Sequence, residues 1–294
     1  MTIPITGHTG LTALLGSPVA HSISPLMHNE SFRLLGLDFV YLCLETTEET
    51  LPVVVEGLRA VNIRGFNLTM PCKNRMVALC DHLSPAARLI GAVNTVVCEN
   101  GVLTGHNTDG IGFWRSAAEE GFSLPGKHIT LMGMGGASTA IAVQAALDGA
   151  SALDIYVRPT SRFYERACRI TEELNDCSSC QVRLFFHGDE TALRESLRRS
   201  QLLVNGTSVG MAPDTDASVI TDPSLFRPGL TVADVIYNPR ETLLLKTARA
   251  AGCRTFNGMY MLLHQGAEAF RLWTGQEMPV EDIRKKFFLD SPFS

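Results

Sequence analysis

The stretch LPGKHITLMGMGGASTAIAVQAALDGA, from Leu124 to Ala150, decides the fold of its part of the chain. A β-prone run ends in the glycine turn of residues 133–136, and an apolar helical run then continues to Gly149. A nucleotide pyrophosphate binds to such a unit, because glycine lets the backbone approach the phosphate and the helix N-terminus offers free N–H groups. Glycine turns also join strands to helices without any ligand, so the surrounding pattern has to decide between the two interpretations.

The pattern after this stretch continues the alternation of strand and helix. Further strands are predicted at ALDIYVRP, CQVRLFF, LLVNGTS and LTVADVIY. Helices are predicted at RFYERACRITEELN, between the first two of these strands, and at ETLLLKTARAAG, after the last. Buried strands separated by helices are typical of a mostly parallel sheet. We therefore predict a Rossmann-type dinucleotide-binding domain over residues 110–257.

The first hundred residues show a second alternating pattern. Strands are predicted at LTALLGS, VYLCLE and GFNLTM, helices at LPVVVEGLRAV and PAARLIGA, and a hairpin in AVNTVVCENGVLTGHNT. In SPLMHNESFRLLG, Ser24 is expected to cap a helix that begins at Pro25 and ends at Gly36. The expected fold class is therefore α/β, with a substrate domain (residues 1–109 plus 258–294) and the Rossmann domain on either side of a cleft.

Composition excludes several classes of protein. The chain has 294 residues, of which 45% are hydrophobic and 19% charged, with a net charge of −5. A basic excess, as a nucleic-acid-binding surface requires, is missing, and no apolar run reaches the ~18 residues of a membrane span. The start MTIPITGHTG lacks a secretory pattern, so we expect a cytoplasmic protein. The single CxxC, Cys177 and Cys180, is compatible with a zinc or redox site, but reduced thiols are the simpler interpretation.

The end of the second predicted strand of the Rossmann domain indicates the cofactor. It reads Arg158-Pro159-Thr160-Ser161-Arg162, without the acid that would bind an NAD ribose. The two arginines fit the 2′-phosphate of NADP, unless they belong to a solvated loop. Asp154 has the sequence spacing of an NAD-binding acid, but it lies early in the strand and is expected to point away from the ribose. NADP is the expected cofactor, with NAD as the alternative.

Polar residues gather at three places in the first domain. Ser22 and Ser24 flank one residue in HSISP, while Asn67 and Thr69 alternate along one predicted strand and so share a face. The third group occupies the arms of the last hairpin and comprises Asn94, Thr95, Asn107, Thr108 and Asp109. Hydroxyls, amides, one lysine and one aspartate suit a polyhydroxylated carboxylic acid as ligand. Ser24 as a simple helix cap and Asn107 as a simple turn residue are the structural alternatives.

The whole set of motifs resembles the shikimate dehydrogenase family. The motifs HSISPLMHN, GFNLTMPCK, GAVNTV, GHNTDGIGF, GMGGAS, NGTSVGM, DVIYNP and MLLHQGAEAF follow one another in the family's order, from about Leu15 to Phe270. The later segments are most similar to the quinate/shikimate dehydrogenase branch. The resemblance implies an oxidoreductase that reduces 3-dehydroshikimate to shikimate, or 3-dehydroquinate to quinate, reversibly and with NADP or NAD.

The resemblance also implies roles for single residues. The catalytic pair would be Lys73 and Asp109. The substrate-binding residues would be Ser22 and Ser24 for the carboxylate, with Thr69, Asn94, Tyr237 and Gln265. The cofactor-binding residues would be Gly133, Gly135, Gly136, Ala137, Arg158, Arg162, Thr207 and Gly258. Val157 and Pro159 depart from the Asn-Arg-Thr motif of the NADP-specific members. No metal site is expected, and the expected partners are the small-molecule substrate and a second copy of the chain in a homodimer.

Three alternatives remain at this point. One is an NAD-preferring quinate dehydrogenase on the same scaffold. Another is a catalytically silent sensor that binds the acid, although the presence of both Lys73 and Asp109 argues against it. A third is a different two-domain dehydrogenase, such as one acting on a folate, which would not require the serine pair. Beside a carboxylate, Lys73 is expected to act mainly as a charged proton donor and orienting group.

Overall fold

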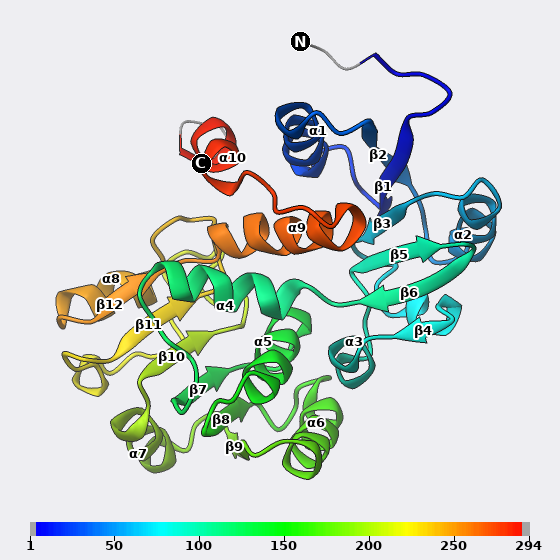
Figure 1. Cartoon of the computed structure of the whole chain (residues 1–294). Coiled ribbons are helices and arrows are strands. Elements are labelled where there is room, and N and C mark those ends of the chain that lie inside the picture. Colours follow the sequence, from blue (N-terminus) through cyan, green and yellow to red (C-terminus); the bar gives the residue numbers. More distant parts are fainter. Residues whose placement is uncertain (1–3, 290–294) are drawn as a thin grey trace. The chain divides into compact units, whose positions relative to one another are not determined.

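The computed structural model describes residues 4–289. The chain divides into two compact units, the first made of Met1–Thr108 with Leu263–Ser294 and the second of Asp109–Leu262. Each unit is built around one six-stranded sheet (Figure 1). The mixed α/β class predicted from the alternation of strands and helices is confirmed.

The sheet of the first unit is mixed. Its strands are β1 (Gly10–Gly16), β2 (Phe39–Glu45), β3 (Gly65–Leu68), β4 (His82–Leu83), β5 (Thr95–Glu99) and β6 (Val102–His106), in the spatial order β2-β1-β3-β5-β6-β4. β1 runs parallel to β2 and β3, whereas β5 is antiparallel to β3 and β6. The predicted hairpin is β5 and β6, and its turn places Asn100 and Gly101 at φ 53° and 78°, which both residue types tolerate.

Helices and a buried apolar cluster complete the first unit. The helices are α1 (Ser24–Leu35), α2 (Leu51–Ala60), α3 (Pro85–Ile90), α10 (Val280–Arg284) and the short turns η1 (Arg75–Leu79) and η3 (Lys285–Leu289). The helix α9 (Met259–Thr274) contains the boundary between the two units. Leu15, Phe66 and Val96, from three neighbouring strands, are fully buried in one core cluster with Leu51 of α2. Burial of these side chains fixes β1, β3 and β5, whose ends carry the candidate substrate residues.

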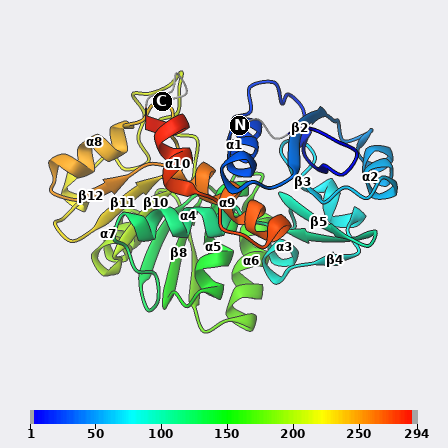
Figure 2. The same ribbon diagram turned by 45° about the horizontal axis from the view of Figure 1, so that its top comes forward.

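All neighbouring strands of the second unit's sheet run parallel. Its strands are β7 (His128–Met132), β8 (Ala152–Val157), β9 (Gln181–Phe186), β10 (Leu202–Asn205), β11 (Thr231–Asp234) and β12 (Arg254–Phe256). Counted in chain order and read from β9 to β12, they lie in the order 3-2-1-4-5-6 of a Rossmann fold. In Figure 2, the labelled strands β12, β11, β10 and β8 lie in this order across the sheet, with β7 between β10 and β8.

The helices of the second unit are α4 (Asp109–Glu119), α5 (Gly136–Leu147), α6 (Tyr164–Cys177), α7 (Glu190–Arg199), α8 (Leu243–Ala250) and the turn η2 (Pro223–Leu225). α4 packs along α5, where the Trp114 indole donates to the Ile141 carbonyl at 3.1 Å. Gly110 allows this approach, because a Cβ there would collide with the Ala140 carbonyl. In such a sheet the chain order reverses between β7 and β10, and ligands bind outside the carboxyl ends of the strands at this point.

Candidate active site

The serine pair lies at the start of α1, and its local geometry differs from the prediction. Ile23, not Ser24, occupies the N-cap position, with helical φ and ψ of −79° and −14°, and no side chain caps the helix. The prediction of Ser24 as N-cap is therefore wrong, because the chain already turns helically at Ile23. The Ser24 amide instead donates to the Ser22 hydroxyl at 3.2 Å. Both serines are half-buried, and this bond holds them side by side.

Tyr41 connects the serines to the centre of the first unit, and the sequence interpretation missed it. Its phenol donates to Asn67 Oδ1 at 2.9 Å and accepts a hydrogen bond from the Ser24 hydroxyl. The ring is fully buried and stacks on His28 with ring centroids 4.5 Å apart. Burial raises the pKa of Tyr41 well above its ordinary value, so the phenol stays a neutral donor. A buried tyrosine hydroxyl needs a polar partner. A tyrosine within a predicted buried strand is therefore the only signal in the sequence that could have indicated this role of Tyr41.

Asn67 lies in the same hydrogen-bond network, and both donors of its side-chain amide are bonded to protein groups. Its Nδ2 donates to the Asn94 carbonyl at 3.1 Å and to Thr95 Oγ1 at 3.0 Å. β3 ends at Leu68, so Thr69 lies just outside the strand, half-buried, with its amide bonded to the Leu15 carbonyl at 2.9 Å. Asn67 therefore acts as a support within the network, whereas Thr69 lies at the strand end.

Asn94 joins chain segments that are far apart in sequence. Its Nδ2 donates to Thr108 Oγ1 at 3.0 Å and to Gln265 Oε1 at 3.5 Å, while its Oδ1 accepts from the Thr108 amide at 2.8 Å. Thr108 Oγ1 in turn donates to the Gln265 carbonyl at 3.0 Å. The structure thus brings together the predicted residues Asn94 and Gln265, although 171 positions separate them. Asn107, the suggested turn residue, is buried and donates to the Ala92 carbonyl.

Lys73 and Asp109 belong to different units. Lys73 is half-buried in the turn between β3 and η1, and its carbonyl accepts from the Val93 amide at 2.9 Å, next to Asn94. Asp109 directly follows Thr108 in the chain and is the first residue of α4. The backbone of Lys73 is therefore tied to the segment that carries Asn94. The pairing of Lys73 with Asp109 stays a prediction.

The glycine turn of the second unit lies at the predicted place between β7 and α5. Gly133 has a φ of 91°, and a Cβ there would lie 2.7 Å from Thr207 Cγ2. At Gly136 a Cβ would meet nothing within 4 Å, and at Gly135 it would meet only the Phe163 ring at 3.9 Å. The backbone at the start of α5 is thus accessible to a ligand, and Ala137 follows in the first turn of that helix. This geometry fits a pyrophosphate at the helix N-terminus.

An arginine cluster lies beside this turn. Arg158 and Arg162 are exposed in the loop after β8, and Arg162 and Arg166 place their guanidinium carbons 4.7 and 5.5 Å from the Phe163 ring centre. Burial lowers the pKa of Arg166, and the nearby charges of Arg169 and Arg162 lower it further. Within residues 4–289, no carboxylate forms an ion pair with Arg158, Arg162 or Arg166. Like charges held together without an acid fit an anionic ligand.

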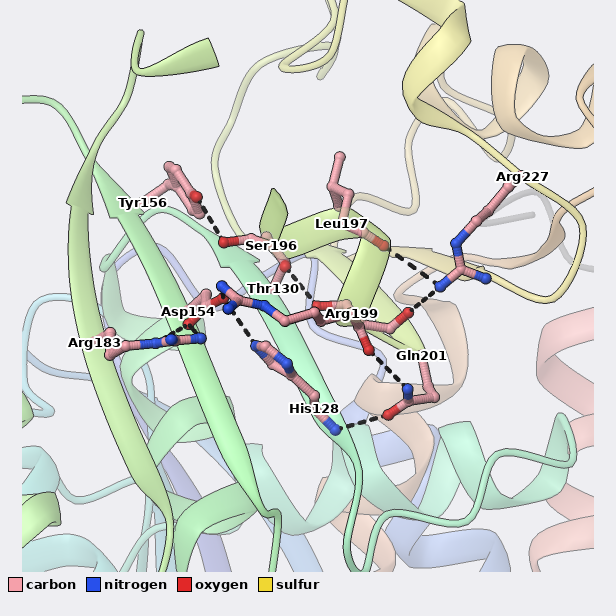
Figure 3. A network of polar contacts seen from close by, with 11 residues as sticks. His128, Thr130, Asp154, Tyr156, Arg183, Ser196, Leu197, Arg199, Gln201 and Arg227 are labelled. Atoms are coloured by element: carbon pink, nitrogen blue, oxygen red, sulfur yellow. Dashed lines mark hydrogen bonds and ion pairs between the residues drawn. The ribbon is translucent and has the colours of Figure 1, made fainter. Parts of the chain in front are cut away.

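Asp154, the acid with NAD-like spacing, is committed to a buried network (Figure 3). It accepts from His128 Nε2 at 2.8 Å and from Arg183 Nε at 2.8 Å, and its side chain is fully buried. Burial alone would raise the pKa of Asp154, but the hydrogen bonds from His128, Ser196 and Arg183 outweigh it and hold the pKa below its ordinary value. Asp154 therefore connects β7, β8 and β9, and its carboxylate is already bound by side chains of the protein.

The remaining predicted residues lie around the ends of β10 and β11. Thr207 follows β10 and donates its hydroxyl to Asn205 Oδ1 at 2.7 Å. Gly258 precedes α9, and a Cβ there would collide with the Val235 carbonyl. Tyr237 follows β11 and is 49% exposed. Ser138, the small residue at the third position of the fingerprint, donates to the Gly206 carbonyl at 2.7 Å and so ties α5 to the turn after β10.

Residues 4–289 contain no cluster of three His, Cys, Asp or Glu side chains able to hold a metal ion. None of the helices formed by these residues is both long and apolar enough to cross a membrane. Cys177 and Cys180 are both free, and burial raises the pKa of the Cys180 thiol to about 11.

Comparison with known proteins identifies the family. The shikimate dehydrogenase substrate-binding domain matches residues 14–96, and the shikimate 5′-dehydrogenase C-terminal domain matches residues 258–286. The chain is 47% identical over 284 residues to the shikimate dehydrogenase (NADP(+)) of Listeria innocua, covering 97% of each chain. The chain belongs to the shikimate dehydrogenase family. The resemblance inferred from its ordered motifs is thereby confirmed.

Two solved structures of dehydrogenases resemble the chain along almost its whole length. Shikimate 5-dehydrogenase from Listeria monocytogenes, in complex with shikimate and NAD, has a TM-score of 0.94 at 47% identity and covers 97% of this chain and 98% of its own. Quinate dehydrogenase from Corynebacterium glutamicum, in complex with NAD, has a TM-score of 0.81 at 30% identity, with 94% and 98% covered. The substrate-binding domain match covers most of the mixed sheet, and the C-terminal domain match covers α9 and α10.

Proposed function

We propose that this protein is an NADP-dependent shikimate dehydrogenase that reduces 3-dehydroshikimate to shikimate and catalyses the reverse oxidation. The observation that carries this proposal is the 47% identity over 284 residues to a shikimate dehydrogenase, with 97% of both chains covered. The continuous polar network of the first unit supports it, because hydroxyl and amide groups suit a polyhydroxylated acid.

Each side of the substrate has its own set of groups in this proposal. The adjacent hydroxyls of Ser22 and Ser24 bind the carboxylate. Asn94 and Gln265, which the structure holds together, bind ring hydroxyls, as does Thr69 at the end of β3. Tyr237 contributes its exposed phenol.

Lys73 and Asp109 perform the proton chemistry. The bound nicotinamide cofactor supplies the hydride in the reductive direction. As charge develops on the carbonyl oxygen, the Lys73 ammonium stabilises it and transfers a proton from Nζ to that oxygen. The Asp109 carboxylate orients the ammonium and accepts a hydrogen bond from a ring hydroxyl. In the oxidative direction Lys73 Nζ takes the proton back.

The arginine cluster supports NADP over NAD. Arg158 and Arg162, with Arg166 beside them, offer guanidinium groups to the 2′-phosphate next to the glycine turn. Asp154, the acid with NAD-like spacing, is already bound by His128 and Arg183. An NAD-preferring quinate/shikimate dehydrogenase is the second candidate, because the related Listeria monocytogenes and Corynebacterium glutamicum structures hold NAD.

A steady-state assay of purified protein tests these assignments. Shikimate and quinate are each oxidised with NADP and with NAD, and kcat/KM is compared across the four combinations. We expect shikimate with NADP to give the highest value. A higher value with quinate and NAD would replace the proposal by the second candidate, and no turnover in any combination would refute a dehydrogenase. We further propose that the protein is a cytoplasmic homodimer. Light scattering after size-exclusion chromatography tests whether it forms a dimer.

A further inference from the structure

Two polar side chains lie opposite each other at the carboxyl ends of β10 and β11. Asn205 is the last residue of β10, Asp234 is the last residue of β11, and the two are register partners. Both side chains are fully buried. None of the cofactor or substrate roles proposed above uses either of them.

The Asp234 carboxylate is surrounded by neutral donors. It accepts from the Ile236 amide at 3.0 Å, from Thr242 Oγ1 at 2.8 Å and from Asn205 Nδ2 at 3.1 and 3.2 Å. No Lys, Arg or His within residues 4–289 forms an ion pair with it. Burial raises the pKa of Asp234, while the hydrogen bonds from Ile236, Thr242 and Asn205 act against this shift. A buried carboxylate without a cation is costly, and it is tolerated only where its lone pairs are filled.

Asn205 connects Asp234 to the loop of residues 206–210, which we call the Thr207 loop. Asn205 Oδ1 accepts from the Thr207 amide at 3.0 Å and from the Thr207 hydroxyl at 2.7 Å. That hydroxyl accepts from the Val209 amide at 3.1 Å. Thr207 Cγ2 occupies the space where a Cβ on Gly133 would lie, so the Thr207 loop packs directly on the glycine turn.

Asp234 also holds the segment of residues 235–238, which we call the Tyr237 segment. Its bond from the Ile236 amide fixes the backbone one residue before Tyr237. On the other side of this segment, the Gly258 amide donates to the Ile236 carbonyl at 3.2 Å, and the Val235 carbonyl fills the place of a Gly258 side chain. Thr242, which caps α8, holds the following stretch to the same carboxylate.

We propose that Asp234, acting through Asn205 and Thr242, is a positioning residue that holds the cofactor-side Thr207 loop and the Tyr237 segment in one fixed arrangement. The inference rests on the proposed function, since Tyr237 is assigned there to the substrate and the family resemblance assigns Thr207 to the cofactor. A neutral side chain of similar shape would avoid the cost of the buried charge. A carboxylate, in contrast, accepts hydrogen bonds from the donors of both segments at once, and it has no hydrogen of its own to donate.

Asp234→Asn tests this role, since its shape is kept but one acceptor oxygen becomes a donor facing other donors. We expect the Kd for NADP, measured by calorimetry, and the KM for shikimate to rise together by about tenfold, which corresponds to about 1.4 kcal/mol. An unchanged Kd and an unchanged KM in a folded variant would overturn the inference.

A second set of variants decides the question if Asp234→Asn does not fold. Thr242→Val removes one donor to the carboxylate, and Thr242→Ser restores it. Thr130→Val is the matched control, because Thr130 is equally buried in the same unit and shares a hydrogen bond of 2.7 Å with Ser200 instead. We expect the Kd for NADP to rise about threefold only in Thr242→Val, which loses the bond to the Asp234 carboxylate and the weak cap bond of 3.4 Å from the Leu245 amide. A similar rise in Thr130→Val, or none in Thr242→Val, would refute the positioning role.

The wild-type measurements keep the two proposals separable. Wild-type protein that binds NADP but does not oxidise shikimate would refute the proposed activity, and the Kd series would still test the positioning of the Thr207 loop. If the wild-type protein oxidises shikimate but the Kd for NADP and the KM for shikimate are the same in all variants, only the role of Asp234 would be refuted.

Discussion

Replacing Tyr41 by phenylalanine separates its hydroxyl from its ring. The ring and its stacking on His28 at 4.5 Å remain, while the hydrogen bond of 2.9 Å to Asn67 Oδ1 and the bond from the Ser24 hydroxyl are lost. Asn67 Oδ1 then stays buried without this donor, which costs about 1–3 kcal/mol of unfolding free energy. We expect the melting temperature to fall by a few degrees.

The same substitution should weaken substrate binding. Ser24 and Asn67 each lose one hydrogen-bond partner. A hydrogen bond of about 0.5–1.5 kcal/mol corresponds to a rise of roughly two- to tenfold in the KM for shikimate. We expect kcat to change less, because neither Lys73 nor Asp109 is altered. Initial rates at saturating NADP, with shikimate varied, measure both constants.

Tyr156→Phe is the matched control for this experiment. Tyr156 is also a buried tyrosine, and its hydroxyl shares a hydrogen bond of 2.8 Å with Ser196 in the second unit. Tyr156→Phe should lower the melting temperature by an amount similar to that of Tyr41→Phe and leave the KM for shikimate unchanged. If Tyr41→Phe also left this KM unchanged, or if Tyr156→Phe raised it equally, the assignment of Tyr41 to the substrate network would be refuted.

Three further predictions concern the proposed catalytic residue Lys73, the arginine cluster and the buried carboxylate of Asp154. Lys73→Ala should lower kcat by at least about two decades while KM stays similar, since general acid–base help is typically ~10²–10⁴-fold; a near-normal kcat would contradict this role. The double variant Arg158→Ala/Arg162→Ala should raise the KM for NADP and leave the KM for NAD unchanged. An equal rise of the KM for both cofactors would argue against a 2′-phosphate site. Asp154→Asn should lower the unfolding free energy by about 3–5 kcal/mol at pH 7. Because the pKa of Asp154 is lowered in the folded protein, this difference should be complete above about pH 4 and shrink as the pH falls through the folded pKa; a loss independent of pH in chemical denaturation would contradict the ionic role.

Regular local patterns predicted much of the fold. The glycine turn, the hairpin at Asn100 and Gly101, and the end of α1 at Gly36 all follow from residues that tolerate a positive φ. The short strand β12 and the helix α7 were not predicted. β12 has only three residues, and α7 is a polar helix with few apolar positions, so neither produces a clear periodic signal.

Sequence and structure contribute different parts of the candidate site. By itself, the sequence determined the family and the glycine turn, because motif order and local backbone chemistry follow the chain, and it predicts Lys73 and Asp109 as the catalytic pair. Only the tertiary structure decided how Tyr41 joins Ser24 to Asn67 and how Asp234 joins two loops. Such hydrogen bonds form between residues far apart in sequence, and their partners are chosen by packing and by the need to satisfy buried polar groups, which no local pattern records.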